Sequence, residues 1–198
     1  MLKYSLTILI ILLGISQFSL TNRFSKPRKI PPGTEFVNHL GYFVDKKVVS
    51  IIDWKEFYWY TKHNLGDSSA LFCLPDTNVI KVYYGKNVYY SENETDKKLP
   101  IVGVTPDQIE KYSEFRTEAV RQLKGFIGSN ITYYPLDSTT YTYLGIADRR
   151  KNIINISSEV PEIIYYNKVQ NISTNNEIQP YKSNSNTVFG FRCIAKFN

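Results

Sequence analysis

Two glutamates in the C-terminal third are the first candidates for chemistry. Glu159 and Glu162 lie three residues apart and are followed by Tyr165 and Tyr166. A pair of carboxylates can perform acid–base catalysis, or it can hold a calcium ion through its oxygen atoms. A solvated pair at a turn is the alternative, and the sequence favours that simpler interpretation.

The other residues that could do chemistry are two cysteines, Cys73 and Cys193, and two histidines, His39 and His63. The cysteines could form a disulfide in an oxidising compartment, or they could be two separate buried thiols. The histidines have no second ligand at a metal-binding spacing, and no nucleophile, P-loop or dinucleotide motif occurs. We therefore expect neither a metal nor a cofactor.

The N-terminus has the pattern of an export segment. Lys3 precedes the apolar run of residues 6–13, and polar residues return from Ser16. A run this short after a positive charge is typical of a signal peptide rather than of a membrane-spanning helix. We expect residues 1–21 to be a signal peptide or a retained anchor, and residues 22–32 to be a proline-containing linker. A single domain, residues 33–198, would then lie outside the cytoplasm, in the periplasm, at the cell surface or secreted.

Charge and composition restrict the possible partners. The net charge is +6, of which Lys3 contributes one, and the basic residues are scattered along the chain. Export argues against nucleic acid, so an envelope protein or an acidic glycan is the partner expected. Membrane contact is expected only through an uncleaved N-terminal segment. The 16 tyrosines suit either a wet, glycan-facing surface or the half-buried face of an irregular domain.

Hydrophobic spacing predicts two main helices. After a hairpin over residues 35–52 with its turn at Asp45-Lys46-Lys47, Asp53 is the expected N-cap of a helix that ends near Gly66. Trp54, Phe57, Tyr58 and Thr61 form its buried stripe, and Trp59 and Tyr60 widen that stripe. The second helix starts with Thr105 as N-cap, Pro106 at N1 and Gln108 at N3, and it ends before Gly125.

Most of the remaining chain reads as irregular structure. Residues 67–98 and 167–187 are expected to be polar loops, the first with short strands at most. Strand-like and turn-like pieces are expected in residues 130–147, a short strand in residues 153–156, and a strand at the C-terminus, where Gly190 interrupts an apolar run. The fold class predicted from these elements is α+β.

Six motifs occur in one order over nearly the whole chain after residue 31. They are Pro32-Gly33-Thr34, Phe43-Val44-Asp45-Lys46 with Val49-Ser50, Asp67-Ser68-Ser69 with Leu74-Pro75-Asp76-Thr77, residues 100–105 with Gln108, Tyr112 and Phe115-Arg116, residues 155–162, and Gly190-Phe191-Arg192-Cys193. In this order they resemble the motifs of the formylglycine-generating enzyme family, also known as the sulfatase-modifying factor domain. The third motif is similar to an insertion in exported members from Bacteroidetes-type bacteria.

The resemblance implies a compact, irregular, C-type-lectin-like fold with two main helices, short strands and much loop. It also implies that Trp54, Glu162, Gly190, Phe191 and Arg192 are structural. Arg192 is expected to be held by a carboxylate or by backbone carbonyls, because a buried guanidinium without partners is very costly.

The chain departs from this family where catalysis takes place. The family enzymes use a pair of cysteines ahead of the closing motif to bind copper, and residues 163–189 contain no cysteine. Ser113 stands where the resemblance places the usual partner of Cys193, which leaves Cys73 as the only other thiol. We therefore expect a non-catalytic binding or structural module of the cell envelope, with no catalytic residue and no cofactor. Related exported domains in gliding-motility and secretion machinery use this fold as a scaffold, which is an analogy of fold alone. The alternative is an enzyme that oxidises a substrate cysteine, or another activity at a remodelled site.

Overall fold

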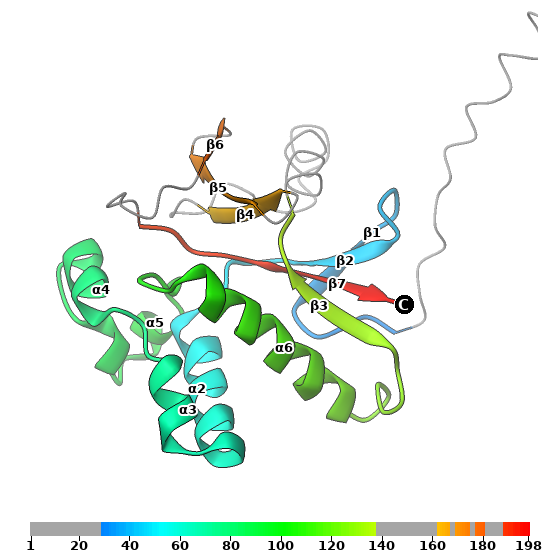
Figure 1. The fold of residues 1–198 in the computed structure, drawn as a ribbon, viewed down its shortest axis with the longest axis horizontal. Coiled ribbons are helices and arrows are strands. Elements are labelled where there is room, and N and C mark those ends of the chain that lie inside the picture. Colours follow the sequence, from blue (N-terminus) through cyan, green and yellow to red (C-terminus); the bar gives the residue numbers. More distant parts are fainter. Residues whose placement is uncertain (1–28, 138–161, 167–168, 175–176, 181–187) are drawn as a thin grey trace, which may run out of the picture.

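The computed structural model describes residues 29–137, 162–166, 169–174, 177–180 and 188–198 (Figure 1). The predicted export segment, the first residues of the linker and the predicted strand at residues 153–156 lie outside these ranges. Within the described ranges, no helix is both long enough and apolar enough to span a bilayer. The described chain has the predicted α+β character, with helices packed beside an antiparallel sheet.

Four strands form the main sheet in the order β1-β2-β7-β3. They are β1 (Thr34–Val37), β2 (Tyr42–Asp45), β3 (Ile131–Pro135) and β7 (Cys193–Phe197), and every pair of neighbours is antiparallel. The C-terminal strand β7 therefore lies inside the sheet, where it pairs with β2 from the N-terminal hairpin on one side and with β3 on the other (Figure 1).

The N-terminal hairpin turns earlier than the sequence predicts. Strand β1 pairs with β2 in the register Val37↔Tyr42, so the turn lies at residues 38–41. Leu40 and Gly41 both donate backbone hydrogen bonds to Val37 O, and Gly41 has φ +73°. The predicted turn at Asp45-Lys46-Lys47 is wrong, because Asp45 ends β2 and its side chain is used in the interior.

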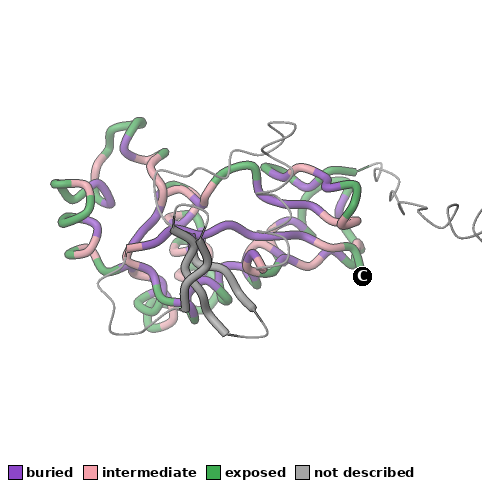
Figure 2. Tube along the Cα trace, turned by 90° about the horizontal axis from the view of Figure 1, so that it is seen from above, coloured by how far each residue is buried: buried purple, intermediate pink, exposed green. Residues whose placement is uncertain are grey.

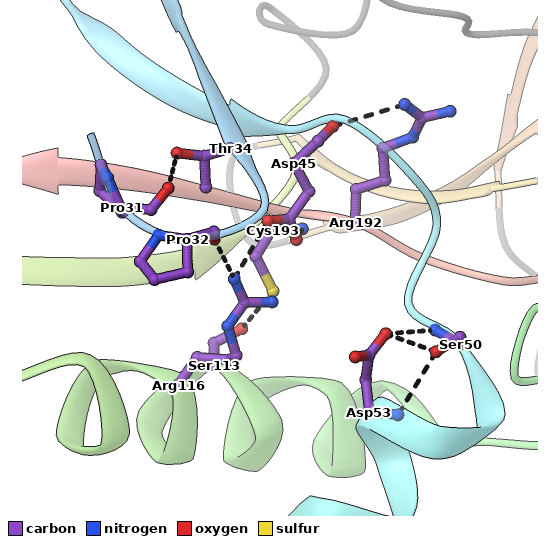
Figure 3. A network of polar contacts seen from close by, with 10 residues as sticks. All are labelled: Pro31, Pro32, Thr34, Asp45, Ser50, Asp53, Ser113, Arg116, Arg192 and Cys193. Atoms are coloured by element: carbon purple, nitrogen blue, oxygen red, sulfur yellow. Dashed lines mark hydrogen bonds and ion pairs between the residues drawn. The ribbon is translucent and has the colours of Figure 1, made fainter. Parts of the chain in front are cut away.

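Helix α2 (Ile51–Leu65) is present, with a different cap from the one predicted. Its N-cap is Ser50, and Asp53 is the N3 residue of a capping box: Asp53 N donates to Ser50 Oγ, and Ser50 N donates to Asp53 Oδ2 (Figure 3). An Asp can serve at either position, which is why the start was predicted three residues too late. The helix ends at Gly66, as predicted.

The segment from residue 67 to residue 98 is helical, so the predicted polar loop is wrong. It contains α3 (Asp67–Phe72), α4 (Thr77–Tyr84), the 3₁₀ turn η1 (Val88–Tyr90) and α5 (Glu94–Lys97). Asp76 caps α4 by accepting from Asn78 N and Val79 N, and Asn93 caps α5 by accepting from Thr95 N. Short caps of this kind start helices too brief to show a clear hydrophobic period.

Helix α6 (Pro106–Gln122) begins and ends as predicted. Thr105 Oγ1 accepts from Gln108 N, and Gln108 Oε1 accepts from Thr105 N, which completes the predicted capping box. The same Gln108 side chain donates to Phe72 O and Leu74 O, so it also ties α6 to the chain after α3.

Helix α6 also covers the outer edge of β3. Tyr133 N donates to Thr117 Oγ1 at 2.9 Å, and Arg121 Nε donates to Ile131 O at 2.9 Å. An uncovered edge strand is a template for pairing with another chain, so these side-chain bonds protect the sheet from edge-to-edge association.

A second sheet of three antiparallel strands begins just before the region predicted to be a loop and extends into it. It consists of β4 (Glu162–Tyr166), β5 (Val169–Thr174) and β6 (Glu177–Pro180) in that order. The predicted loop over residues 167–187 is therefore wrong at β5 and β6. Asn and Ser dominate that stretch of sequence, and they masked its strand-forming isoleucines and valine.

The core is largest on the face of the main sheet that meets α2 and α6. Buried residues alternate with exposed ones along the helices (Figure 2). Phe43 and Ala195 belong to this core, whereas their neighbours Val44 and Ile194 belong to a smaller cluster on the other face, as strand alternation requires. Trp54, Phe57 and Thr61 of α2 are buried as predicted. Trp59 is 60% exposed, so the predicted widening of the buried face is wrong at that position.

Candidate functional site

The Arg192 guanidinium is held in the interior by the Glu162 carboxylate. Arg192 Nε donates to Glu162 Oε2 at 2.9 Å, and Arg192 Nη2 donates to Glu162 Oε1 at 2.9 Å. The remaining nitrogen, Arg192 Nη1, donates to Lys46 O at 3.1 Å and to Asp45 O at 3.5 Å. Both side chains are buried, and the two parallel hydrogen bonds let the negative carboxylate and the positive guanidinium compensate each other's charge. Arg192 thus has the predicted type of partner, a carboxylate together with backbone carbonyls.

A second ion pair joins the partly buried Arg116 to the buried Asp45, whose backbone carbonyl also accepts from Arg192 (Figure 3). Arg116 of α6 donates to Asp45 Oδ1 at 3.2 Å, while Asp45 Oδ2 accepts from Cys193 N at 2.9 Å. One carboxylate therefore links β2, α6 and β7. The Arg116 guanidinium also lies 4.6 Å from the centre of the Tyr133 ring, in cation–π geometry.

The environment of Asp45 opposes its charge as well as compensating it. Burial raises the pKa of the Asp45 carboxyl above its ordinary value. The positive charge of Arg116 and the hydrogen bond from Cys193 N lower that pKa, but burial has the larger effect. Asp45 is thus a carboxylate that depends on its partners to stay ionised inside the protein.

The Cys193 thiol faces the Ser113 hydroxyl at 3.5 Å, and both residues are buried. The contact brings together the two positions that the family resemblance pairs. Burial raises the pKa of the Cys193 thiol to about 12. Because a thiolate is the reactive form of cysteine, Cys193 is an inert side chain at neutral pH.

The aromatic core lies directly behind these ion pairs. Trp54 stacks on Tyr112 with ring centres 5.5 Å apart, and Phe191 meets both rings edge-to-face. Phe191 and Trp54 are fully buried, as predicted. Gly190 is buried as well and forms a parallel bridge with Glu162, which places the start of β4 beside the closing motif.

Cys73 and Cys193 do not form a disulfide; both are free, buried thiols. Cys73 Sγ lies 3.7 Å from Ser69 O, one turn earlier in α3, whereas Cys193 Sγ contacts Ser113 on α6. The Cys73 carbonyl accepts a 2.7 Å hydrogen bond from Trp54 Nε1. Cys73 is therefore bound to the helical part of the core rather than to the thiol on β7.

Glu162 is not a solvated residue, because its carboxylate is buried against Arg192. Its predicted neighbour Glu159 lies outside the described residues. His39 lies in the turn after β1 and His63 in the last turn of α2, and both are exposed. Within the ranges the structure describes, no three His, Cys, Asp or Glu side chains gather closely enough to hold a metal ion.

Reasoning from sequence missed the contact between Asp45 and Arg116. The two residues are 71 positions apart, and the sequence places Asp45 at a predicted turn and Arg116 in a separate motif. The available signal was their buried setting: Asp45 ends a strand of apolar residues, and Arg116 lies on the apolar stripe of its helix. A charged residue at each of two core positions suggests an ion pair.

Comparison of the chain with protein-family models, with curated proteins and with solved structures found no match.

Proposed function

We propose that this protein is an exported, non-catalytic module of the cell envelope, built on a domain of the sulfatase-modifying-factor type. In this proposal residues 1–21 direct export, residues 22–32 link that segment to the domain, and residues 33–198 bind an envelope protein or a glycan, or support an envelope assembly.

One observation carries the assignment to this type of domain: motifs far apart in the sequence meet in one buried cluster. Asp45 of the second motif binds Arg116 of the fourth. Glu162 of the fifth motif binds Arg192 of the sixth, and the backbone of Cys193 returns to Asp45. Motifs that matched by chance would not be expected to form one network of contacts.

Two features of the cluster support a structural role rather than catalysis. Each arginine is paired with a carboxylate at 3.2 Å or less, so neither charge is held in reserve for a substrate. The Cys193 thiol is buried, is protonated at neutral pH and faces a hydroxyl in place of a second thiol. Together these groups stabilise the junction of β2, α6 and β7.

An exposed aromatic surface beside α2 supports a binding role. Trp59 and Tyr90 are 60% and 64% exposed. The ring of Trp59 meets that of Tyr58 edge-on, and the ring of Tyr90 meets that of Tyr89 in the same way. Lys62, which pairs with Asp67 at 3.2 Å, lies over the Trp59 ring, and Lys55 lies over the ring of the buried Tyr89. The exposed rings of Trp59 and Tyr90 can stack on sugar rings, and the Lys55 ammonium can pair with an acidic group of a glycan.

Export is tested by cell fractionation of the full-length chain. The protein should be found outside the cytoplasm, with a mature N-terminus between residues 19 and 24 if the segment is cleaved. A full-length product confined to the cytosol would overturn the export proposal.

Lack of catalysis is tested with purified protein, copper and a Cys-x-Pro-x-Arg peptide. We expect no formylglycine in the peptide by mass spectrometry. Turnover that disappears in Cys193→Ser would contradict the proposal, because it would identify a working thiol site.

A further inference from the structure

A cavity of about 370 Å³ opens between α2, α3 and α6, on the side of the helices away from the sheet's ion pairs. Its volume lies within the range that small-molecule sites occupy in proteins. Phe57, Thr61, Cys73 and Phe115 are buried and form its inner wall. The inner wall is thus mostly apolar, with one thiol and one hydroxyl.

Two large apolar side chains stand exposed at the mouth of this cavity. Leu65 at the end of α2 is 67% exposed, and Phe72 at the end of α3 is 46% exposed. An apolar body entering the cavity would cover both side chains and remove their surface from water. The mouth therefore favours a ligand with an apolar end.

The rim of the cavity carries an excess of negative charge. Two carboxylates line it, Glu114 and Glu118, one turn apart on α6, whereas Lys111 is the single ammonium group among the residues that line the cavity. Lys111 Nζ contacts Glu114 Oε2 at 2.7 Å, while Glu118 Oε2 accepts from the Tyr60 hydroxyl at 2.7 Å. A phenol donates a hydrogen bond but does not neutralise a carboxylate, so one negative charge remains at the rim.

Aromatic rings lie beside this charge. The Tyr60 ring is 4.9 Å from that of Phe115, which in turn is 5.4 Å from that of Phe57. A cation that reaches Glu118 would thus also meet the face or edge of an aromatic ring, and both contacts favour a positive group.

We infer that this cavity binds a small amphipathic cation, an amine with an aromatic or branched aliphatic body. The apolar body fills the cavity against the inner wall of Phe57, Thr61 and Phe115, and the ammonium pairs with Glu118. This inference rests on the proposed binding role, and it adds a small-molecule ligand to the envelope protein or glycan proposed above. Ligand binding is measured on purified protein, so a negative binding result leaves the tests of export and of catalysis unaffected.

The probe is phenethylamine, compared with 2-phenylethanol and 3-phenylpropionate, which have the same body with a neutral or a negative end. Saturation-transfer NMR and calorimetric titration of the full-length protein measure the affinities. We expect phenethylamine to bind about tenfold more tightly than 2-phenylethanol, the value of one charge-assisted contact. Equal affinities of the three probes would overturn the inference.

Three variants locate the site. Glu118→Gln keeps an oxygen for the Tyr60 hydroxyl but removes the charge, and it should reduce the preference for the amine to about twofold or less. Ser69→Phe places a ring in the cavity and should abolish binding of both phenyl probes. Glu110→Gln, on the same helix but outside this cavity, is the control and should leave all affinities unchanged.

Thermal unfolding verifies that each variant is folded. If Ser69→Phe does not fold, Phe72→Ala replaces it, and the loss of an apolar wall at the mouth should weaken phenethylamine and 2-phenylethanol alike, severalfold. Undiminished binding in a folded Ser69→Phe or in Phe72→Ala, or an unchanged amine preference in Glu118→Gln, would overturn the inference.

Discussion

The hydroxyl of Ser113 on α6 lies 3.5 Å from the thiol of Cys193 on β7, and both side chains are buried. A serine and a cysteine 80 residues apart therefore occupy positions where two sulfurs could bond. The contact joins the longest helix to the strand inside the main sheet, so a covalent link there would connect both halves of the core.

The substitution Ser113→Cys is expected to form a disulfide with Cys193. Closing a loop of 80 residues restricts the unfolded chain, so the free energy of unfolding should rise by up to about 4 kcal/mol. Thiol titration under denaturing conditions and thermal unfolding with and without reductant measure the effect. Ser113→Ala, which cannot cross-link, should unfold identically in both conditions; free thiols in an air-oxidised Ser113→Cys protein would contradict the expectation.

Glu162→Gln is expected to destabilise the protein by about 3–5 kcal/mol, because it leaves the buried Arg192 guanidinium without a counter-charge. Denaturant unfolding measures the change. Glu92→Gln is the matched control: Glu92 pairs with Lys97 but is 89% exposed, so its loss should change stability by less than about 0.5 kcal/mol. Similar costs for the two variants would show that the Arg192 pair is less buried than the structure has it.

Trp54→Ala and Trp59→Ala test the orientation of α2. Trp54 is fully buried, stacks on Tyr112 and bonds to the Cys73 carbonyl, so its removal should cost about 3–5 kcal/mol. Trp59 is mostly exposed, and its loss should cost about 1 kcal/mol or less. Chemical denaturation compares the two, and a reversed order would mean that the helix is rotated.

The elements that could be predicted from the sequence are those with strong local signals. Helix α6 has a threonine cap, a proline at its first position and a glutamine that completes the capping box, and all three act within four residues. Glycine at residue 66 stops α2 for an equally local reason. The short helices α3 to α5 lack a clear helical period of apolar residues, because each presents only a few residues to the core.

The site depended on longer-range information. Family resemblance, rather than periodicity, indicated that Arg192 needs a buried partner and that Ser113 faces Cys193. It did not indicate that Asp45 would bind Arg116, since that contact depends on how β2 and α6 pack. The cavity beside Phe57 was invisible for the same reason: its walls come from three helices, one of which the sequence did not predict.

The buried Cys193 thiol should make stability fall at alkaline pH. Burial raises its pKa from 9.0 to about 12, so above pH 9 the unfolded chain loses a proton that the folded protein keeps. Below pH 9 both states hold the proton and this residue contributes no pH dependence. Between about pH 8 and about pH 10 the wild type should therefore lose about 1.4 kcal/mol more unfolding free energy than Cys193→Ala. Equal losses, measured in urea at both pH values, would indicate an ionised or accessible thiol.

Deletion of residues 189–198 is expected to abolish cooperative unfolding. The last strand, β7, pairs with β2 on one side and with β3 on the other, so its loss would separate the N-terminal hairpin from β3. It would also remove Phe191 from the aromatic core, leave the Glu162 carboxylate without Arg192, and take the Cys193 N–H away from Asp45 Oδ2. Calorimetry and near-ultraviolet circular dichroism measure the transition. Removal of Phe197 and Asn198 alone is the control: both are exposed at the end of β7, and their loss should lower the melting temperature while preserving one cooperative transition. A truncated protein that melted like the intact chain would mean that the closing motif is peripheral, and the assignment to this type of domain would lose the contact network that supports it.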